Sequence, residues 1–321
     1  MNFAIVGCGL IGQKRASNLH DNKLLYACDV DINKSKLISE KHNSCVAISD
    51  LDIICTDNKI DAVIVSVTNN QLFPVSLKLI ESGKNILIEK PGSISVDELL
   101  QLKKSMEKHN SIIRFGYNHR YHPACIKLLE LIKDESIGEF MFLRGRYGHG
   151  GRIGYEKEWR FNKNISGGGE LIDQGVHLID LSSIFLGEFV YIDGHINTYY
   201  WNTNLEDNAF LNLRNSKNNT AWLHVSCTEW KNTFSLELYF KHAKFHWEGL
   251  GGSYGTERLY YYKMTEEMGP PDTEIYEFPK QDNSWKIEIN EFISDIKLKR
   301  IPNPGIKEAI NTLNVVETIY K

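Results

Sequence analysis

The first strand-like run of the chain leads directly into a glycine pattern that few protein turns accommodate. Asn2–Val6 is apolar, the glycines that follow it have G-x-G-x-x-G spacing, and Ile11–His20 has a helical pattern. In such a strand–turn–helix the first glycine permits a tight turn, the second lets phosphates approach the backbone, and the third allows close helix–strand packing. The N–H groups that open the helix favour negative charge. The pattern therefore predicts a dinucleotide-binding turn formed by Gly7, Gly9, Leu10, Ile11 and Gly12.

An acidic residue in the right place strengthens this prediction. Asp29 ends the next apolar run, Leu24–Cys28. A carboxylate at this point accepts hydrogen bonds from the adenosine ribose and repels a 2′-phosphate, so the sequence favours NAD over NADP. The alternative is a glycine turn in an ordinary α/β protein.

Composition narrows the class of protein. The net charge is −4, from 37 basic and 41 acidic side chains, so neither nucleic acid nor an anionic membrane is expected as a main partner. The six cysteines show no C-x-x-C spacing, which favours reduced thiols. Without a signal peptide or a long apolar stretch, we expect a cytoplasmic protein.

The chain divides by pattern near residue 120. Up to that point short apolar runs alternate with helical patterns, which predicts a parallel sheet covered by helices on both faces. One of these helices, Val96–His109, begins with a capping box formed by Ser95 and Glu98. The expected strands are Asn2–Val6, Leu24–Asp29, Ala62–Val67, Asn85–Glu89 and Ile112–Tyr117; the other expected helices are Ile32–His42 and Gln71–Ser82.

The hydrophobic pattern is different in the second part of the chain. Its runs alternate polar with apolar residues, as in Phe234–Leu238, which predicts an antiparallel sheet with one exposed face. We therefore predict a domain of residues 1–120 followed by an α+β domain of residues 121–321. The expected strands are Phe140–Tyr147, Val190–Thr198, Asn208–Leu213, Thr220–Cys227, Phe234–Phe240, Arg258–Lys263 and Glu274–Phe278; the expected helices are Pro123–Lys133, Glu170–Phe185, Trp285–Lys297 and Ile306–Tyr320.

Two segments carry residues suited to catalysis. Lys90 follows a parallel strand at its carboxyl end, where ligands of such sheets bind, and could stabilise charge on a substrate oxygen. Asp173 and His177 lie four residues apart on one helical face, a pairing suited to general acid–base chemistry. Three glycines precede them and would let a ligand approach the helix amides. The structural alternatives are a solvated lysine and a surface ion pair.

Two further groups of polar residues have open interpretations. The basic residues between Arg144 and Arg160, among them Arg146, could bind an anion or could belong to a solvated loop. His119 and His122 form an H-x-x-H at the expected domain junction. Because no carboxylate lies at ligand spacing, we expect no zinc site there.

Together these segments resemble the Gfo/Idh/MocA (glucose–fructose oxidoreductase/inositol dehydrogenase/rhizopine catabolism) family. The markers, in chain order, are the glycine turn, Glu89-Lys90-Pro91, Gly116-Tyr117-Asn118-His119-Arg120, Trp159-Arg160, and Gly167-Gly168-Gly169 leading to Asp173 and His177. The resemblance covers essentially the whole chain. It implies an α/β Rossmann domain with a parallel sheet, followed by an α+β domain with a large open, mostly antiparallel sheet.

The resemblance also implies roles for particular residues. Lys90, Asp173 and His177 would be catalytic and line the substrate site, and the Lys90–Pro91 bond would be cis. Besides the glycine turn and Asp29, cofactor-binding residues would be Thr68, Asn70, Glu89, Lys90, Asn118, Trp159 and Arg160. Substrate-binding residues would also include His119, Arg120 and Arg146.

One loop departs from the family pattern. The family often has Thr-Pro-Asn here with a histidine three residues later, whereas this chain has Asn69 in place of the proline and Phe73 in place of the histidine. The change concerns how the loop holds the nicotinamide half of the cofactor.

The expected activity is NAD-dependent oxidation of a secondary alcohol on a sugar, nucleotide sugar or polyol, or reduction of the matching ketone. The expected assembly is a homo-oligomer, a dimer or tetramer. Two alternatives are open: a reductase of the same family that acts on a non-sugar carbonyl, imine or dihydrodiol, and a non-catalytic dinucleotide-binding sensor.

Overall fold

The computed structural model describes residues 1–265 and 267–321, which form two compact units. Unit 1 comprises Met1–Tyr117, Asn164–Gly167 and Trp285–Leu313. Unit 2 comprises Asn118–Lys163, Gly168–Ser284 and Asn314–Lys321. The boundary predicted near residue 120 falls close to Tyr117, but the sequence pattern gave no sign that two later segments belong to unit 1.

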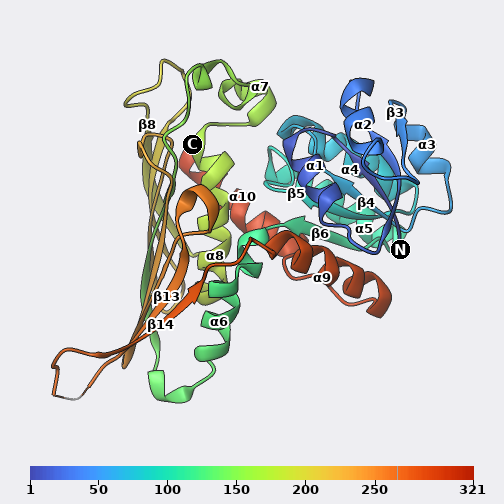
Figure 1. Ribbon diagram of the computed structural model, residues 1–321. Helices are drawn as coiled ribbons and strands as arrows, with labels where there is room; N and C mark the ends of the chain where they lie inside the picture. The colour runs from blue at the N-terminus through green and yellow to red at the C-terminus, as the bar shows by residue number, and fades with distance from the viewer. Residues whose placement is uncertain (266) are drawn as a thin grey trace. The chain divides into compact units, whose positions relative to one another are not determined.

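Unit 1 is built on a six-stranded sheet in the order β3-β2-β1-β4-β5-β6, and every pair in it is parallel. Figure 1 shows helices on both faces of this sheet, as its strands of buried aliphatic residues require. The predicted parallel Rossmann sheet is confirmed. The strands are β1 (Asn2–Val6), β2 (Lys23–Cys28), β3 (Val46–Ile48), β4 (Ala62–Val65), β5 (Asn85–Glu89) and β6 (Ile113–Gly116).

The helices of unit 1 follow the predicted pattern with two short additions, α3 and α7. The helix predicted from the capping box, α5, begins where expected: Ser95 Oγ accepts the Glu98 N–H at 3.3 Å, and Glu98 accepts the Ile94 N–H at 3.2 Å. The edge strand β3 and the helix α3 were not predicted because both are short, with three and six residues, and repeat their pattern too few times to be recognised. The helices are α1 (Leu10–Ser17), α2 (Ile32–Ser39), α3 (Leu51–Thr56), α4 (Asn69–Glu81), α5 (Val96–His109), most of the short α7 (Lys163–Ser166), α9 (Ser284–Leu298) and the first part of α10 (Ile306–Tyr320).

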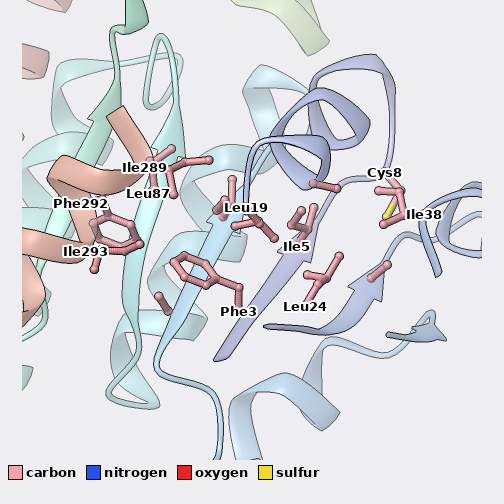
Figure 2. Close-up of a cluster of buried hydrophobic side chains, with 14 residues drawn as sticks. Phe3, Ile5, Cys8, Leu19, Leu24, Ile38, Leu87, Ile289, Phe292 and Ile293 are labelled. Carbon is pink, nitrogen blue, oxygen red and sulfur yellow. The ribbon is translucent and has the colours of Figure 1, made fainter. Parts of the chain in front are cut away.

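The core of unit 1 joins the start of the chain to a helix near its end. Phe3 and Ile5 of β1 pack in one buried cluster with Leu87 of β5 and with Phe292 of α9, as Figure 2 shows. The rings of Phe3 and Phe292 meet edge to face, with centroids 6.5 Å apart. The helix α9 therefore completes the Rossmann core.

Unit 2 is built on an eight-stranded sheet in the order β14-β13-β12-β11-β7-β10-β9-β8. Only β7 and β10 pair in parallel; the other pairs are antiparallel, so the predicted mostly antiparallel sheet is confirmed. The strands are β7 (Phe140–Gly148), β8 (Tyr191–Asn197), β9 (Asn208–Arg214), β10 (Thr220–Ser226), β11 (Thr233–Phe240), β12 (Ala243–Glu248), β13 (Glu257–Lys263) and β14 (Asp272–Phe278).

One face of this sheet is covered and the other is not. Within the described residues, α6 (Pro123–Leu131) and α8 (Val176–Leu186) lie along one face and no helix covers the other (Figure 1). Strand β12 was not predicted, because the turn that separates it from β11, formed by Lys241 and His242, contains no glycine, proline or asparagine to signal a break. Shorter turns in unit 2 are η1 (Asn118–Tyr121), η2 (Glu135–Ile137), η3 (Tyr155–Lys157), η4 (Trp159–Phe161), η5 (Leu171–Gly175) and η6 (Gly252–Tyr254).

Among the helices of the described residues, none combines the length and the apolar character that a membrane span requires.

Candidate active site

The glycine turn of unit 1 has the geometry that its spacing predicts. Gly7 adopts φ +90°, and a Cβ there would lie 2.4 Å from the Ser66 carbonyl oxygen. A Cβ on Gly12 would lie 2.0 Å from the Gly7 carbonyl oxygen, so both positions exclude any side chain. Gly9, in contrast, faces open space: apart from its chain neighbours, no atom of the described residues lies within 4 Å of its ideal Cβ position. This opening at the start of α1 fits a pyrophosphate that approaches the backbone.

Asp29 fixes the turn and presents a carboxylate beside it. One of its oxygens accepts the Cys8 N–H at 2.7 Å and the other accepts the Asp31 N–H at 2.9 Å. A carboxylate has capacity for further hydrogen bonds, so these contacts leave the predicted interaction with ribose hydroxyls chemically feasible. Burial raises the pKa of the Cys8 thiol to about 12, which keeps it neutral beside the carboxylate.

The loop after β4 shows how the chain accommodates its departure from the family pattern. Asn69, at the proline position, is buried, and its amide donates to the Ser166 carbonyl at 2.8 Å. The neighbouring Thr68 hydroxyl donates to the Asn70 side-chain oxygen at 3.0 Å. The Asn69 amide thus binds a second chain segment of unit 1, an interaction that a proline could not make.

A buried charge network supports the strand end that carries Lys90. Glu89 accepts a hydrogen bond from Arg15 Nε of α1 at 2.6 Å, and the same guanidinium contacts Glu288 of α9 at 2.6 Å. The Lys90–Pro91 bond is cis, as the resemblance implies. Glu89 was also predicted to bind the cofactor; its carboxylate pairs with Arg15, because a buried guanidinium requires a charged partner, and a contact of Glu89 with the cofactor stays a prediction.

Unit 2 carries the other predicted site residues. Asp173 lies in η5, a π-helical turn that leads into α8, and such turns often occur at functional sites. Its carboxylate accepts a hydrogen bond from Arg160 Nε at 2.9 Å. Although burial acts to lower the pKa of Arg160, the Asp173 carboxylate raises it above the ordinary value. Arg160 also lies over the Trp159 ring, 4.8 Å from its centroid, so the predicted Trp-Arg pair and Asp173 form one cluster.

His177, four residues further on, is buried and packs against aromatic rings. Its imidazole stacks on His119 of η1 with centroids 3.9 Å apart and an interplanar angle of 29°. Tyr147 of β7 meets His119 and His177 edge to face at 5.2 and 6.1 Å. Burial raises the pKa of Tyr147 well above its usual value, so this phenol stays protonated. The structure therefore brings His119 and His177 together, as predicted for a common site.

Two predicted residues have contacts that favour other roles. Asn118 donates to Ser284 Oγ at 3.0 Å, and Arg120 forms a pair of 2.7 Å hydrogen bonds with Asp180, which is buried on α8. Both arrangements hold η1 within unit 2, and contacts of Asn118 with cofactor and of Arg120 with substrate stay predictions.

Arg146 lies away from His177. Consecutive residues of a strand point to opposite faces, and its neighbour Tyr147 faces the covered side with His177. Arg146 instead lines a groove on the uncovered face together with Trp222 and His224. Arg146 was predicted to bind substrate; it lies on the face opposite Tyr147, and a contact of Arg146 with substrate stays a prediction.

The remaining basic residues of this region do not form a single anion pocket. Arg144 pairs with Glu237, Arg152 with Glu158, and Arg160 with Asp173. The two histidine rings of the H-x-x-H lie near one another, with centroids 5.5 Å apart, but they have different partners. His122 Nδ1 lies 3.0 Å from Glu257, while the His119 ring stacks on His177. Among the described residues no cluster of His, Cys, Asp and Glu could hold a metal ion.

Two site residues were missed in the sequence. Tyr147 was placed in a strand without a role, although its position in the alternation marked it as facing the helices. Tyr155 contacts His149 Nε2 at 3.3 Å, and His149 lies 3.7 Å from Glu170, immediately before η5. Nothing in the local pattern signals this second contact, because it joins segments 21 residues apart.

Comparison with known proteins identifies the family. Residues 1–117 match the model of the oxidoreductase family with an NAD-binding Rossmann fold, and residues 126–246 match the GFO/IDH/MocA C-terminal domain. The two matches cover most of both units. The chain belongs to the Gfo/Idh/MocA oxidoreductase family, and its first unit is the NAD-binding Rossmann domain.

Individual relatives are distant. D-glucoside 3-dehydrogenase of Escherichia coli (strain K12) is 24% identical over 58% of this chain and 54% of its own length. Trans-1,2-dihydrobenzene-1,2-diol dehydrogenase of Xenopus tropicalis is 25% identical over 52% of this chain and 50% of its own length. The chain thus spans about half the length of these curated relatives.

A solved structure shows the same fold over the whole chain. Levoglucosan dehydrogenase in complex with NADH and L-sorbose aligns with a TM-score of 0.88 at 16% identity, covering 100% of this chain and 95% of that one.

Proposed function

We propose that the protein is an NAD-dependent oxidoreductase that acts on a secondary alcohol, or the matching ketone, of a sugar, nucleotide sugar or polyol. The observation that carries the proposal is the buried cluster of unit 2, in which Asp173 is held by Arg160 and His177 is stacked on His119. The open space at Gly9 and the family match of unit 1 support the cofactor. The names of distant relatives, D-glucoside 3-dehydrogenase among them, support the substrate class.

Each residue of the proposed site has a defined task. NAD, when bound, supplies the hydride chemistry. His177 takes the proton of the substrate hydroxyl, and Asp173, fixed by Arg160, favours the charged imidazolium. Lys90 donates a hydrogen bond to the same substrate oxygen and stabilises its negative charge.

Substitution of the proposed catalytic residues tests these roles. Lys90→Ala and His177→Ala should each reduce kcat by at least about a hundredfold while NADH binding changes little. NADH absorbance with a panel of glucosides, polyols and nucleotide sugars measures turnover, and NADH fluorescence measures binding. The matched controls, Lys103→Ala and His242→Ala, remove exposed side chains and should leave both values unchanged. Normal turnover in both site variants would refute the assignment.

A second candidate is a reductase of the same chemistry that acts on a non-sugar carbonyl, imine or dihydrodiol. Two observations favour this candidate. One relative is a trans-1,2-dihydrobenzene-1,2-diol dehydrogenase, and the rings of Tyr147, His119 and His177 pack together in unit 2. Adding trans-dihydrodiols and cyclic imines to the panel separates the two. Tight NADH binding with no turnover of any compound would instead support a non-catalytic sensor.

We also propose that the protein is a homo-oligomer, a dimer or tetramer, assembled through the uncovered face of the unit 2 sheet. This face carries Trp222, which is 64% exposed, beside a stack of His195, Phe210 and His224. Large exposed apolar groups of this kind mark interaction surfaces. Light scattering of the wild type should give at least a dimer, and Trp222→Glu should give a monomer; a monomeric wild type would overturn the proposal.

A further inference from the structure

The helix that carries Asp173 and His177 begins with a cap that comes from distant parts of unit 2. The first N–H groups of a helix have no partner within it and need one from elsewhere. Glu206, in the loop between β8 and β9, accepts the Gly169 N–H at 3.0 Å and the Leu171 N–H at 3.1 Å through one carboxylate oxygen. Its backbone carbonyl accepts the Glu170 N–H at 3.0 Å. The expectation that a ligand approaches these amides is therefore wrong, because Glu206 occupies them.

The penultimate residue of the chain completes this cap. The Tyr320 hydroxyl donates to the same Glu206 oxygen at 2.6 Å. Burial raises the pKa of the Glu206 carboxyl and raises the pKa of the Tyr320 phenol well above its usual value, so Tyr320 stays protonated and acts as the donor.

The preceding glycines are required by this arrangement. A Cβ on Gly168 would lie 2.0 Å from the Tyr320 hydroxyl oxygen, and a Cβ on Gly169 would lie 2.2 Å from the Glu206 carbonyl oxygen. Contacts under 3.0 Å do not occur without displacement of the neighbour. The glycine run thus provides space for Tyr320 and Glu206.

Hydrogen bonds link this cap to the backbone of Asp173, which carries the proposed catalytic carboxylate. The Asp173 N–H donates to the Gly169 carbonyl at 3.2 Å, and the Gly169 N–H is held by Glu206. Asp173 also lies in the π-helical turn η5, a rare backbone form that tertiary contacts have to maintain. Loosening the cap therefore shifts the backbone of Asp173 directly.

We propose that Glu206 and Tyr320 are positioning residues that hold Gly169 and the π-helical turn so that Asp173 is correctly placed for the reaction. The proposal rests on the proposed function, in which Asp173 acts on the substrate. It assigns a role in activity to the last turn of α10.

Tyr320→Phe tests the proposal because it removes only the hydroxyl. We expect kcat, divided by the number of NADH-binding sites, to fall about tenfold, the effect of one lost hydrogen bond to a charged group, with the Kd for NADH unchanged. Glu206→Gln retains an oxygen acceptor and should keep more activity than Glu206→Ala. The matched control is Tyr276→Phe, which removes another tyrosine hydroxyl that donates to a glutamate, Glu274, at 2.5 Å in β14; it should change none of these values.

Amide hydrogen exchange gives a readout that needs no substrate. In Tyr320→Phe the amides from Gly169 to Asp173 should exchange at least about tenfold faster than in the wild type, and in Tyr276→Phe they should not. Unchanged exchange, or faster exchange with normal kcat, would overturn the positioning role. A wild type that turns over no compound of the panel counts against the proposed function, while the exchange result still reports on the cap.

Discussion

At the scale of single residues, a buried arginine forms ion pairs with two carboxylates. Arg15 is fully buried and contacts Glu89, next to Lys90, as well as Glu288 of α9. A buried ion pair is weak evidence of net stabilisation, but removing one partner leaves a charge with no compensation. The network therefore fixes the strand end that presents Lys90, and its loss is costly.

Arg15→Met should lower the free energy of unfolding by about 3–5 kcal/mol, because two buried carboxylates lose their charged partner. Urea denaturation measures the change. The control is Lys78→Met, which removes an exposed pair with Asp52 and should cost less than about 1 kcal/mol. Equal effects of the two substitutions would contradict the proposed importance of burial.

The same network predicts a pH dependence. Burial raises the pKa of Glu288 to about 7, although Arg15 opposes the shift. The folded state then binds more protons than the unfolded state between the ordinary glutamate pKa, about 4.3, and about 7. This contribution to stability is complete below that window and is lost as the pH rises through it. Glu288→Gln should therefore become more stable relative to the wild type as the pH rises from about 4.5 to about 7; a constant difference would argue against the shift.

At the scale of elements, two helical segments differ in where their N-terminal capping residues come from. The start of α5 is capped by Ser95 and Glu98, residues next to it in the chain, so a local pattern predicted it at the correct residue. The segment with Asp173 is capped by Glu206 and Tyr320, and the sequence predicted neither the cap nor the π-helical turn. The glycine turn resembles the start of α5 in this respect, because the spacing of neighbouring glycines was enough to predict its backbone conformation.

Gly9→Ala tests the function of that turn separately from its shape. Because a Cβ at Gly9 meets no atom of the protein within 4 Å, the melting temperature should hardly change. The methyl group occupies the space that the pyrophosphate approaches, so the Kd for NADH should rise at least about tenfold. Fluorescence titration measures it. Gly269→Ala, also in open space, is the control and should bind NADH normally; weakened binding in both variants would show a nonspecific effect.

At the scale of the whole molecule, unit 1 is not continuous in the sequence. Its core contains Phe3 and Ile5 from the first strand and Phe292 from α9, a helix near the other end of the chain. A fragment that ends near the predicted boundary at residue 120 therefore lacks part of the core. The Rossmann domain of this chain is complete only with a segment that follows most of unit 2 in the sequence.

Phe292→Ala should lower the free energy of unfolding by about 3–5 kcal/mol, because it leaves a cavity beneath Phe3. Leu298→Ala, on the same helix but 70% exposed, is the control and should change stability by less than about 0.5 kcal/mol. Thermal and urea denaturation measure both. A small effect at Phe292 would contradict the role of α9 in the core.

The sequence by itself determined the elements whose signals are local. The glycine spacing, the capping box of α5 and the alternation of β11 depend on neighbours within a few residues, so they predicted the Rossmann turn, the helix start and the open sheet. The order of motifs also singled out Lys90, Asp173 and His177 as candidates. The partners of these residues were not predictable in the same way.

Only the tertiary structure decided which side chains contact the candidate site residues and their neighbours. Three contacts join segments that the sequence alone does not bring together. They are Arg160 with Asp173, His119 with His177, and Arg15 with Glu89. The same holds for Tyr320, whose hydroxyl reaches the segment before α8 from α10. Local patterns specify backbone conformation, whereas packing specifies which side chains meet.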